Sequence, residues 1–435
     1  MLEYLPLILF GAIFLLILLG YPVAFTLGGL SVIVGVIVFD IDFFYLLSLR
    51  IYGTMQNFVL LAVPLFVFMG IMLEKSGIAE RLLETMAMMF GKFRGGLALS
   101  VIIVGAMLAA STGIVGATVV TMGLISLPTM LKRGYKPSIA TGTIASSGTL
   151  GQIIPPSVVL VLLGSVLNVS VGELFMAAIV PGIGLVLLYA VYILGYAQLF
   201  PDSVPAMPRE EIKAFRKLGF TKEIVVTFMM PFMLILAVLG SIFAGIASPT
   251  EAAGVGAFGA ILLTVLQRKL SFKILADVTR ETTYLTCMVF MIFVGATAFS
   301  LVFRGLEGDR FFLDVIEQSQ LGPYGFLFLV MVIVFIAGFF IDFIEIVFII
   351  VPVVAPIFSS MGVDLVWVGI LLAINLQTSF LTPPFGFALF YLKGVAPKGV
   401  KTSDLYRGII PFVIIQLIFL GLLISFPEML TLFKD

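Results

Sequence analysis

Long apolar runs separated by short polar segments fill this chain. A helix needs roughly 20 mainly apolar residues to cross a membrane, and by this criterion the first part contains spans near 5–20, 22–39, 57–73, 137–166 and 172–199. The pattern resumes with predicted spans near 224–246, 249–267, 284–303, 364–393 and 405–426. Segments of mixed polarity predict amphipathic helices at the membrane surface, at 40–56, 74–95 and 268–283. The pattern predicts an all-α polytopic membrane protein.

Polar, helix-breaking residues interrupt four of the apolar stretches. We expect 96–131, broken at Ser111–Gly116, and 325–358, broken at Gly338–Glu345, to be re-entrant helical hairpins. The spans 137–166 and 364–393 are predicted broken helices, because their polar runs end in Pro-Pro pairs. Unpaired backbone groups cannot face lipid. Paired breaks in two halves of a chain therefore indicate a binding site of the kind found in transporters.

Proline and glycine positions reveal an internal repeat. A shift of 228 residues brings Pro128, Gly134, Pro155 and Pro156 onto Pro356, Gly362, Pro383 and Pro384. Each half has five predicted crossings if its hairpin enters and leaves on one side. Because five is odd, the second half starts on the opposite side of the membrane and is inverted relative to the first. We therefore predict an inverted-topology repeat with residues 1–199 as the first unit, 200–223 as a cytoplasmic linker and 224–435 as the second unit.

The basic residues predict how the chain is oriented in the membrane. Of its 24 lysines and arginines, all but Arg50, Arg304, Arg310 and Lys434 fall in segments that this topology places on one side. Basic loops stay cytoplasmic, so both termini are predicted to be periplasmic. The hairpin 96–131 then enters from the cytoplasm, and 325–358 enters from the periplasm.

Composition narrows the function classes. The chain is 61% hydrophobic and 11% charged with a formal net charge of zero, so the lipid bilayer is an expected partner and nucleic acid is not. It has no histidine, and its single cysteine, Cys287, lies in an apolar run. No catalytic set is evident, so we do not expect an enzyme. A channel is disfavoured, because selectivity filters are built from rings of repeated elements.

The breaks carry the candidate site residues. Hydroxyl and carbonyl oxygens at these positions predict a cage for a small monovalent cation, whereas amides and half-helix N-termini suit a polar, carboxylate-bearing substrate. The predicted sodium ligands are Ser111, Gly113, Ser146, Gly148, Thr149, Gly338, Asp342, Asn375, Thr378 and Ser379. The predicted substrate-binding residues are Ser111, Thr112, Ser147, Gln152, Asp342, Asn375 and Gln377.

Structural alternatives exist for the same residues. Ser and Thr near a Pro-Pro pair can simply bond back to their own helix. Asp342 and Glu345 either line the site or cap a helix, and the sequence leaves both open. Ser248-Pro249-Thr250-Glu251 predicts a helix cap. Arg304 and Arg310 are expected to pair with Glu307 and Asp309 in a loop, which would leave helix ends and neutral side chains to hold an anion.

Four of these motifs resemble the large membrane subunit of TRAP transporters, the DctM family: Ala110–Gly113, Ser147–Ser157, Ser248–Ala253 and Leu376–Pro384. The resemblance covers essentially the whole chain. It implies a multi-pass protein of a bacterial or archaeal inner membrane that imports an organic acid, driven by sodium. It also implies a small DctQ-like membrane subunit, a DctP-like periplasmic substrate-binding protein, and no cofactor beyond sodium as coupling ion.

Two finer expectations remain. Phe340–Glu345 and Gln152 resemble the branch often labelled for mannitol or chloroaromatic acids. The resemblance also implies an elevator motion, in which the hairpins slide past a frame formed by 5–39 and 224–267. The alternative is a stand-alone sodium- or proton-coupled carboxylate carrier of related inverted-repeat fold.

Overall fold

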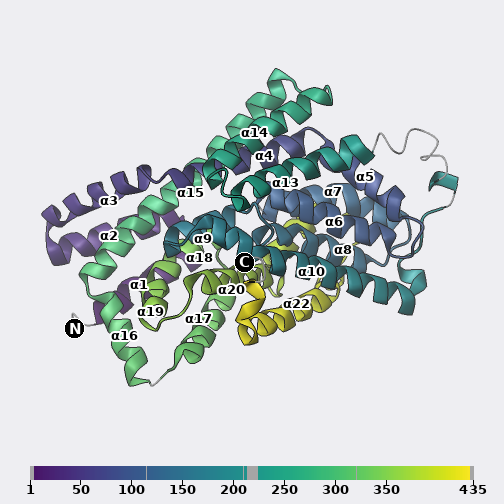
Figure 1. The fold of residues 1–435 in the computed structure, drawn as a ribbon. Coiled ribbons are helices and arrows are strands. Elements are labelled where there is room, and N and C mark those ends of the chain that lie inside the picture. The colour runs from purple at the N-terminus through teal and green to yellow at the C-terminus, as the bar shows by residue number, and fades with distance from the viewer. Residues whose placement is uncertain (1–3, 114, 209, 213–223, 320, 432–435) are drawn as a thin grey trace.

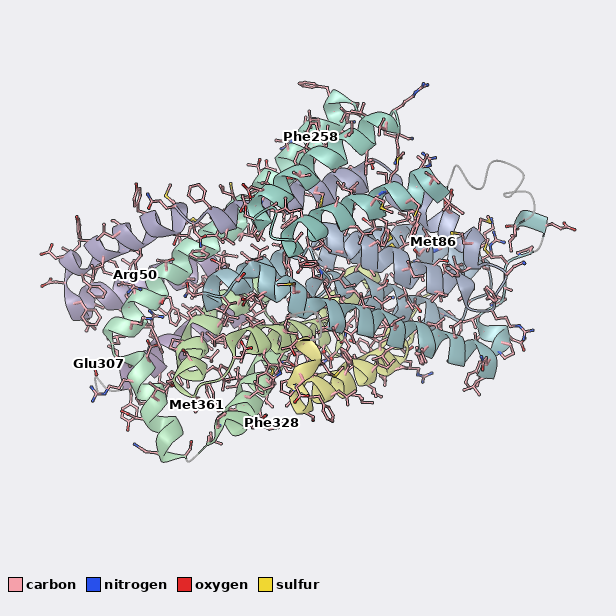
Figure 2. All side chains as sticks on the ribbon, in the orientation of Figure 1. Arg50, Met86, Phe258, Glu307, Phe328 and Met361 are labelled. Atoms are coloured by element: carbon pink, nitrogen blue, oxygen red, sulfur yellow. The ribbon has the colours of Figure 1, made fainter. Side chains whose placement is uncertain are left out.

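The computed structural model describes residues 4–113, 115–208, 210–212, 224–319 and 321–431, and the regular elements in these ranges are all helical. Seven helices are long and apolar enough to cross a membrane. The bent pair α18 (Phe343–Ile349) and α19 (Val351–Ser360) forms an eighth candidate span if the two are counted as one. Apolar side chains such as Phe258 and Phe328 project outward with 67% and 72% of their surface exposed (Figure 2). The prediction of an all-α polytopic membrane protein is confirmed.

The helices of the first half follow the predicted order (Figure 1). They are α1 Leu5–Leu18, α2 Val23–Phe39, α3 Tyr45–Met55, α4 Ala62–Lys75, α5 Ile78–Phe90, α6 Gly96–Thr112, α7 Val115–Lys132, α8 Pro137–Thr149, α9 Val158–Leu167 and α10 Val171–Leu199. Short 3-10 turns precede α3 and α4, at Ile41–Phe44 and Phe58–Leu61.

The second half repeats this order after a π-helical turn at Val225–Met229. Its helices are α13 Met230–Phe243, α14 Pro249–Leu266, α15 Phe272–Gly305, α16 Gly308–Gln318, α17 Pro323–Ala337, α18 Phe343–Ile349, α19 Val351–Ser360, α20 Leu365–Leu381, α21 Phe387–Val395 and α22 Thr402–Ser425. The 228-residue shift brings α8, α9 and α10 onto α20, α21 and α22. Residues 213–223 of the predicted linker lie outside the described ranges.

One predicted boundary is wrong. We expected a surface helix at 268–283 and a separate span at 284–303, but α15 is a single helix of 34 residues. Ser271 starts it by accepting a hydrogen bond from the Ile274 N–H at 3.1 Å, and neither glycine nor proline follows before Gly295. A change of polarity alone does not end a helix. In the first half the Asn57 side chain caps a new turn by accepting from the Val59 N–H at 3.1 Å, so α3 and α4 stay separate.

The hairpins and broken helices end where backbone chemistry requires it. Gly113 ends α6 with a φ of 64°, in the left-handed region that favours glycine. The pair α18 and α19 bends by 51° where Pro352 occupies the first turn of α19 and removes an N–H donor. The Pro155–Pro156 and Pro383–Pro384 bonds are both cis.

The hairpins and broken helices pack into one block. Helix α8 lies against α6, α7 and α22, and α20 lies against α22, α17 and α9. Helices in membranes approach closely through small residues. At the α8–α22 contact a Cβ added to Gly142 would lie 2.2 Å from the Gly408 carbonyl oxygen. We call the helices α6–α9 and α17–α22 the central block.

The remaining long helices interlock the two halves. Helix α15 of the second half packs along α2 of the first, and α4 of the first half packs along α14 of the second. Helices α4 and α15 also contact each other, so α2, α15, α4 and α14 form a continuous row beside the central block (Figure 1). A Cβ on Gly295 would lie 2.5 Å from the Ala24 carbonyl oxygen, which shows how closely α15 approaches α2.

Charged segments gather at the two ends of the molecule. At one end the linker contacts two basic segments. The Gly95 backbone N–H donates to the Val204 carbonyl at 2.9 Å, and the Lys136 backbone N–H donates to the Ser203 carbonyl at 3.0 Å. Lys75 and Glu281 pair at 2.7 Å. Arg50 and Glu307 lie at the opposite end from Met86 of α5 (Figure 2). The predicted segregation of basic residues is consistent with these contacts, and the side that faces the cytoplasm stays a prediction.

Candidate functional site

The two hairpin tips and the two broken helices surround one cavity of about 260 Å³, which we call the tip cavity. Four helices of the central block begin at it. Its lining residues there are Val115 and Gly116 of α7, Val158 of α9, Asp342, Phe343 and Ile344 at the start of α18, Phe380 of α20, and Phe387 and Tyr391 of α21. Val67 of α4 and Leu285, Met288 and Val289 of α15 complete the wall. The cavity therefore lies between the central block and the row of long helices.

The tip of the first hairpin rests against the second parts of both broken helices. A Cβ on Gly113 would lie 3.0 Å from the Val158 side chain, and one on Gly116 would lie 3.0 Å from the Tyr391 ring. Any larger residue at Gly113 would also need a left-handed backbone. The side chains of the predicted site residues Ser111 and Thr112, and residue 114, lie outside what the structure describes.

Asp342 serves both roles that the sequence left open. Its carboxylate caps α18 by accepting from the Phe343 N–H at 2.7 Å, and the Glu345 carboxylate accepts from the Asp342 N–H at 3.3 Å in a capping box. Among the described residues, Asp342 is also the only predicted site residue that lines the tip cavity. A carboxylate has further lone pairs beyond one cap bond. Glu345 is accounted for by the cap.

The first broken helix stays α-helical through Thr149. Residues 146–149 remain helical, and the break spans a 3-10 turn at Leu150–Gln152 and the residues up to Pro156. The hydroxyls of Ser146, Ser147 and Thr149 donate back to carbonyls of α8 at 2.9–3.1 Å. Gly148 lies within α8 and makes room for α7, because a Cβ there would lie 2.5 Å from the Val119 side chain.

The second broken helix repeats this arrangement. Thr378 and Ser379 donate to the Ile374 and Leu376 carbonyls at 2.7 and 2.8 Å. Asn375 donates from Nδ2 to the Met331 carbonyl of α17 at 2.8 Å. This bond joins α20 to the second hairpin, residues 325–358. A Cβ on Gly338 would lie 2.0 Å from the Ser379 hydroxyl. A hydroxyl that donates its hydrogen keeps its lone pairs, so these oxygens remain available to a cation.

Among the described residues, four glutamine amides are buried without a hydrogen-bond partner: those of Gln152, Gln267, Gln377 and Gln416. Gln152 and Gln377 are fully buried, and neither the nitrogen nor the oxygen of either amide forms a hydrogen bond with a described residue. A buried polar group without a partner costs about 1–3 kcal/mol. Both residues stand next to the breaks, so a ligand that reaches them would recover this energy.

Sequence reasoning missed the aromatic and apolar part of the cavity wall. Tyr391 follows the second Pro-Pro pair by seven positions and could have been noticed as an amphipathic aromatic near a break. Val67, Leu285 and Met288 carry no such signal, because they belong to unbroken apolar helices. Only the crossing of α4 and α15 beside the central block brings them to the cavity.

The fold and the cavity define a class of protein. Two hairpins and two broken helices in repeated halves, arranged around one cavity, are the architecture of secondary transporters. Residues 10–429 match the family model described as Tripartite ATP-independent periplasmic transporter, DctM component. The chain belongs to this family, and it is a large permease subunit of the TRAP type.

Known relatives are similar over almost the whole chain. The C4-dicarboxylate TRAP transporter large permease protein DctM of Pseudomonas aeruginosa is 31% identical over 92% of this chain and 91% of that protein. The ectoine/5-hydroxyectoine permease UehC of Ruegeria pomeroyi is 32% identical over 86% of each chain. The sialic acid permease SiaM of Vibrio cholerae is 29% identical over 88% of each. The family resemblance is confirmed, and the mannitol or chloroaromatic branch stays a prediction.

A solved structure shares the fold. The crystal structure of the YdaH transporter of Alcanivorax borkumensis aligns with a TM-score of 0.64 over 98% of this chain and 99% of that one. Their sequences are 13% identical, so the similarity concerns the fold alone.

Proposed function

We propose that this permease imports an organic acid, held by its carboxylate in the tip cavity and driven by sodium. One observation carries the proposal: α7, α9 and α21 begin at the wall of this cavity, whereas α18 begins there already capped by the Asp342 carboxylate. Helix N-termini carry unpaired N–H groups and a partial positive charge, which favour an anion. Gln152 and Gln377 stand next to the breaks and do not line the cavity in this structure, and we propose their amides as further polar contacts to the substrate. No arginine lines the cavity among the described residues.

The substrate class agrees with the names of the relatives. These proteins are named for C4-dicarboxylates, sialic acid and ectoine, and each of these compounds carries a carboxylate. We propose that the coupling ions are sodium, bound by oxygens of Ser146, Thr149, Thr378 and Ser379 with carbonyls at the hairpin ends. Hard oxygen donors without histidine suit such a cation.

We further propose that the central block moves as an elevator. The tip cavity is closed on one side by the block and on the other by α4 and α15. If the block slides along these two helices, one site becomes accessible from each face in turn, without separate gates at each tip.

The proposed assembly follows from the tripartite family description. It comprises this permease, a small DctQ-like membrane subunit and a DctP-like periplasmic binding protein, in the inner membrane with both termini periplasmic. The basic end of the molecule would face the cytoplasm.

Uptake into proteoliposomes tests the proposal. The permease and its small subunit are reconstituted, the binding protein is added outside, and uptake of radiolabelled succinate, sialic acid and ectoine is measured. We expect saturable uptake of one acid that requires an inward sodium gradient. Equal uptake driven by a proton gradient without sodium would contradict the coupling. Full-rate uptake without the binding protein would contradict the tripartite assembly.

A further inference from the structure

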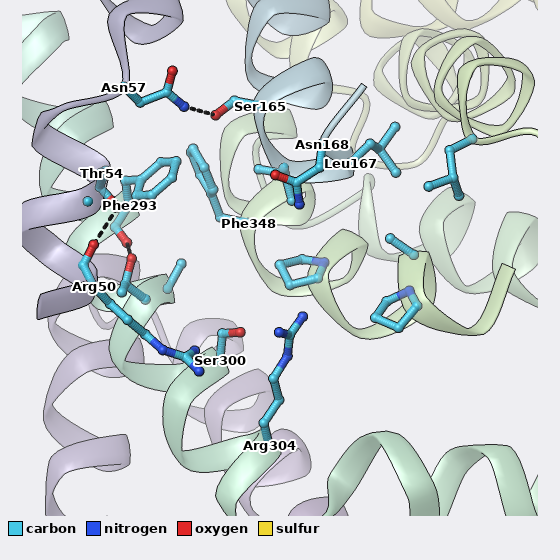
Figure 3. Close-up of a pocket in the computed structure, with 18 of the residues that line it drawn as sticks. Arg50, Thr54, Asn57, Ser165, Leu167, Asn168, Phe293, Ser300, Arg304 and Phe348 are labelled. Carbon is cyan, nitrogen blue, oxygen red and sulfur yellow. Dashed lines mark hydrogen bonds between the residues drawn. The ribbon is translucent and has the colours of Figure 1, made fainter. Parts of the chain in front are cut away.

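A second cavity of about 610 Å³, here called the outer cavity, lies at the Arg50 and Arg304 end of the molecule. Helices α3 and α15 form one wall, and the end of α9 together with α18 and α19 forms the other. Asn57, before α4, donates to the Ser165 hydroxyl of α9 at 3.2 Å between the two walls (Figure 3). The outer cavity thus lies on the same interface as the tip cavity, between the central block and the long helices.

The charge in the outer cavity has one sign. Arg50 and Arg304 are the only charged residues that line it among the described residues, and its other polar groups are neutral hydroxyls and amides. Both guanidinium groups point into the cavity beside Ser300 (Figure 3). The pKa of Arg50 is lowered by burial and by the positive charge of Arg304, yet arginine stays protonated in proteins. Each arginine therefore experiences the other as a repulsive neighbour.

This positive charge is only partly compensated. Arg304 pairs through Nε with Asp309 at 3.5 Å, and its other donors remain directed at the cavity. Burial raises the pKa of Asp309, which weakens it as a counter-ion, although Arg304 opposes this shift. No described carboxylate forms an ion pair with Arg50. Two arginines that share a polar cavity without enough negative charge favour the binding of an anion.

The outer cavity leads toward the tip cavity along helices that line both, most closely along α15 and α18. On α15, Val289 lines the tip cavity and Phe293, one turn further, lines the outer one. On α18 the same one-turn step connects Ile344 with Phe348. The rings of Phe293 and Phe348 meet edge to face with centroids 4.8 Å apart. An aromatic contact between the central block and α15 therefore lies at the end of the outer cavity that is nearest to the tip cavity.

We propose that the outer cavity is a first binding station, where Arg50 and Arg304 hold the carboxylate of the incoming substrate before it reaches the tip cavity. The inference rests on the proposed transport of a carboxylate. Guanidinium groups bind carboxylates through two parallel hydrogen bonds, and a positively charged cleft raises the local concentration of anions. The contact between Phe293 and Phe348 blocks passage until the block moves, because one ring belongs to each side of the moving interface.

Charge-selective labelling of a cysteine in the outer cavity tests the proposal without requiring transport. Ser300→Cys is introduced in a Cys287→Ser background, because Cys287 is an exposed free thiol. The permease with its small subunit is reacted with anionic sulfonatoethyl or cationic trimethylammonioethyl methanethiosulfonate. We expect the ratio of the anionic to the cationic rate to fall about tenfold in Arg50→Gln/Arg304→Gln. An unchanged ratio would overturn the proposal.

Three controls make the labelling specific. Arg310→Gln removes an arginine at the same end that is 75% exposed and does not line the cavity, so the ratio should stay unchanged. Arg50→Lys/Arg304→Lys keeps both positive charges, so most of the preference for the anionic reagent should remain. This result would show that the loss in the glutamine variant comes from the missing charge and not from misfolding. Sodium succinate should slow the anionic labelling relative to sodium chloride of equal ionic strength, and only when both arginines are present. Absence of this protection would also overturn the binding station.

Uptake separates this inference from the proposed function. We expect kcat/KM for the transported acid to fall about tenfold in Arg50→Gln/Arg304→Gln, with little change in Arg310→Gln. Unchanged kcat/KM in the double variant alongside normal sodium-driven uptake would overturn the station and leave the proposed function standing. Arginine-dependent labelling with protection, but no uptake of any acid, would support the anion site and refute transport.

Discussion

At the scale of single residues, the amides of Gln152 and Gln377 are buried without a partner, as are those of Gln267 and Gln416 far from the breaks in the chain. Buried polar side chains are almost always hydrogen-bonded, and these four have no partner among the described residues. Natural proteins accept this cost where a ligand supplies the missing bonds. Neither Gln152 nor Gln377 lines the tip cavity in this structure, but both stand next to a helix break, so substrate contact is a hypothesis that a substitution can test.

Gln377→Met tests this hypothesis. Methionine fills a similar volume without a polar group, so we expect unchanged or slightly higher thermal stability, since the unpartnered amide costs about 1–3 kcal/mol. Sodium-driven uptake should fall at least about tenfold if the amide binds substrate. The matched control is Gln416→Met, a fully buried glutamine on α22, where uptake should be retained. Normal uptake by the Gln377 variant would assign that amide to the fold alone.

Asp342 caps α18 and lines the tip cavity, and two substitutions can separate the cap from the proposed sodium-binding role. Asparagine caps helices as well as aspartate does, whereas alanine costs about 1 kcal/mol at such a position. We expect Asp342→Asn to keep the melting temperature but to raise the sodium concentration for half-maximal uptake at least about tenfold, because a charged ligand is lost. Asp342→Ala should lower the melting temperature and should also raise the sodium concentration for half-maximal uptake. A normal sodium dependence in Asp342→Asn would leave the cap as its only role.

Close helix contacts hold the central block together at the scale of elements. Helices α8 and α22 meet through Gly142 and Gly408, and a Cβ on Gly408 would lie 2.0 Å from the Ser138 carbonyl oxygen. Backbone atoms on rigid helices cannot move aside as a flexible side chain can. The broken helix α8 therefore depends on a glycine of another helix far away in the sequence.

Gly408→Ala should destabilise the permease by about 1–3 kcal/mol, because the methyl group forces α8 and α22 apart. Gly421→Ala on the same helix is the matched control. Nothing lies within 4 Å of its Cβ position, and alanine favours a helix more than glycine does. Thermal unfolding in detergent should show a lower midpoint for the first variant and an equal or higher one for the second. Equal midpoints would contradict the close contact.

The whole molecule consists of a central block beside a row of long helices, and both cavities lie between the two parts. The contact of Asn57 with Ser165 crosses this interface, whereas Lys75 with Glu281 joins α4 and α15 within the row. An elevator motion breaks contacts of the first kind and preserves those of the second. These two pairs offer a direct test of the motion.

Cross-linking should therefore have opposite effects at the two pairs. In a Cys287→Ser background, a short bis-methanethiosulfonate reagent across Asn57→Cys and Ser165→Cys should abolish uptake, and reduction should restore it. The same reagent across Lys75→Cys and Glu281→Cys should leave uptake nearly unchanged, because α4 and α15 move together. Full uptake with the first link complete would rule out sliding of the block past α4.

The sequence by itself determined the helical class, the repeat and the sites of the breaks. Apolar length, Pro-Pro pairs and glycine positions act on the local backbone, so their effects can be predicted without knowing what packs against the segment. The capping box at Ser248 and Glu251 was predicted in this way and is observed. The sequence also predicted that Arg304 and Arg310 pair with Glu307 and Asp309 in a loop. The structure pairs Arg304 with Asp309 and Arg310 with Glu307, but the arginines lie on α15 and α16.

Tertiary structure alone decided which of these features meet. Arg50 and Arg304 are 254 positions apart in the chain, and only the packing of α15 along α2 and α3 brings them into one cavity. The same packing supplies the apolar wall of the tip cavity. Local patterns specify where a helix starts and stops. Its partners depend on close contacts such as Gly295 against Ala24, which no pattern within one segment encodes.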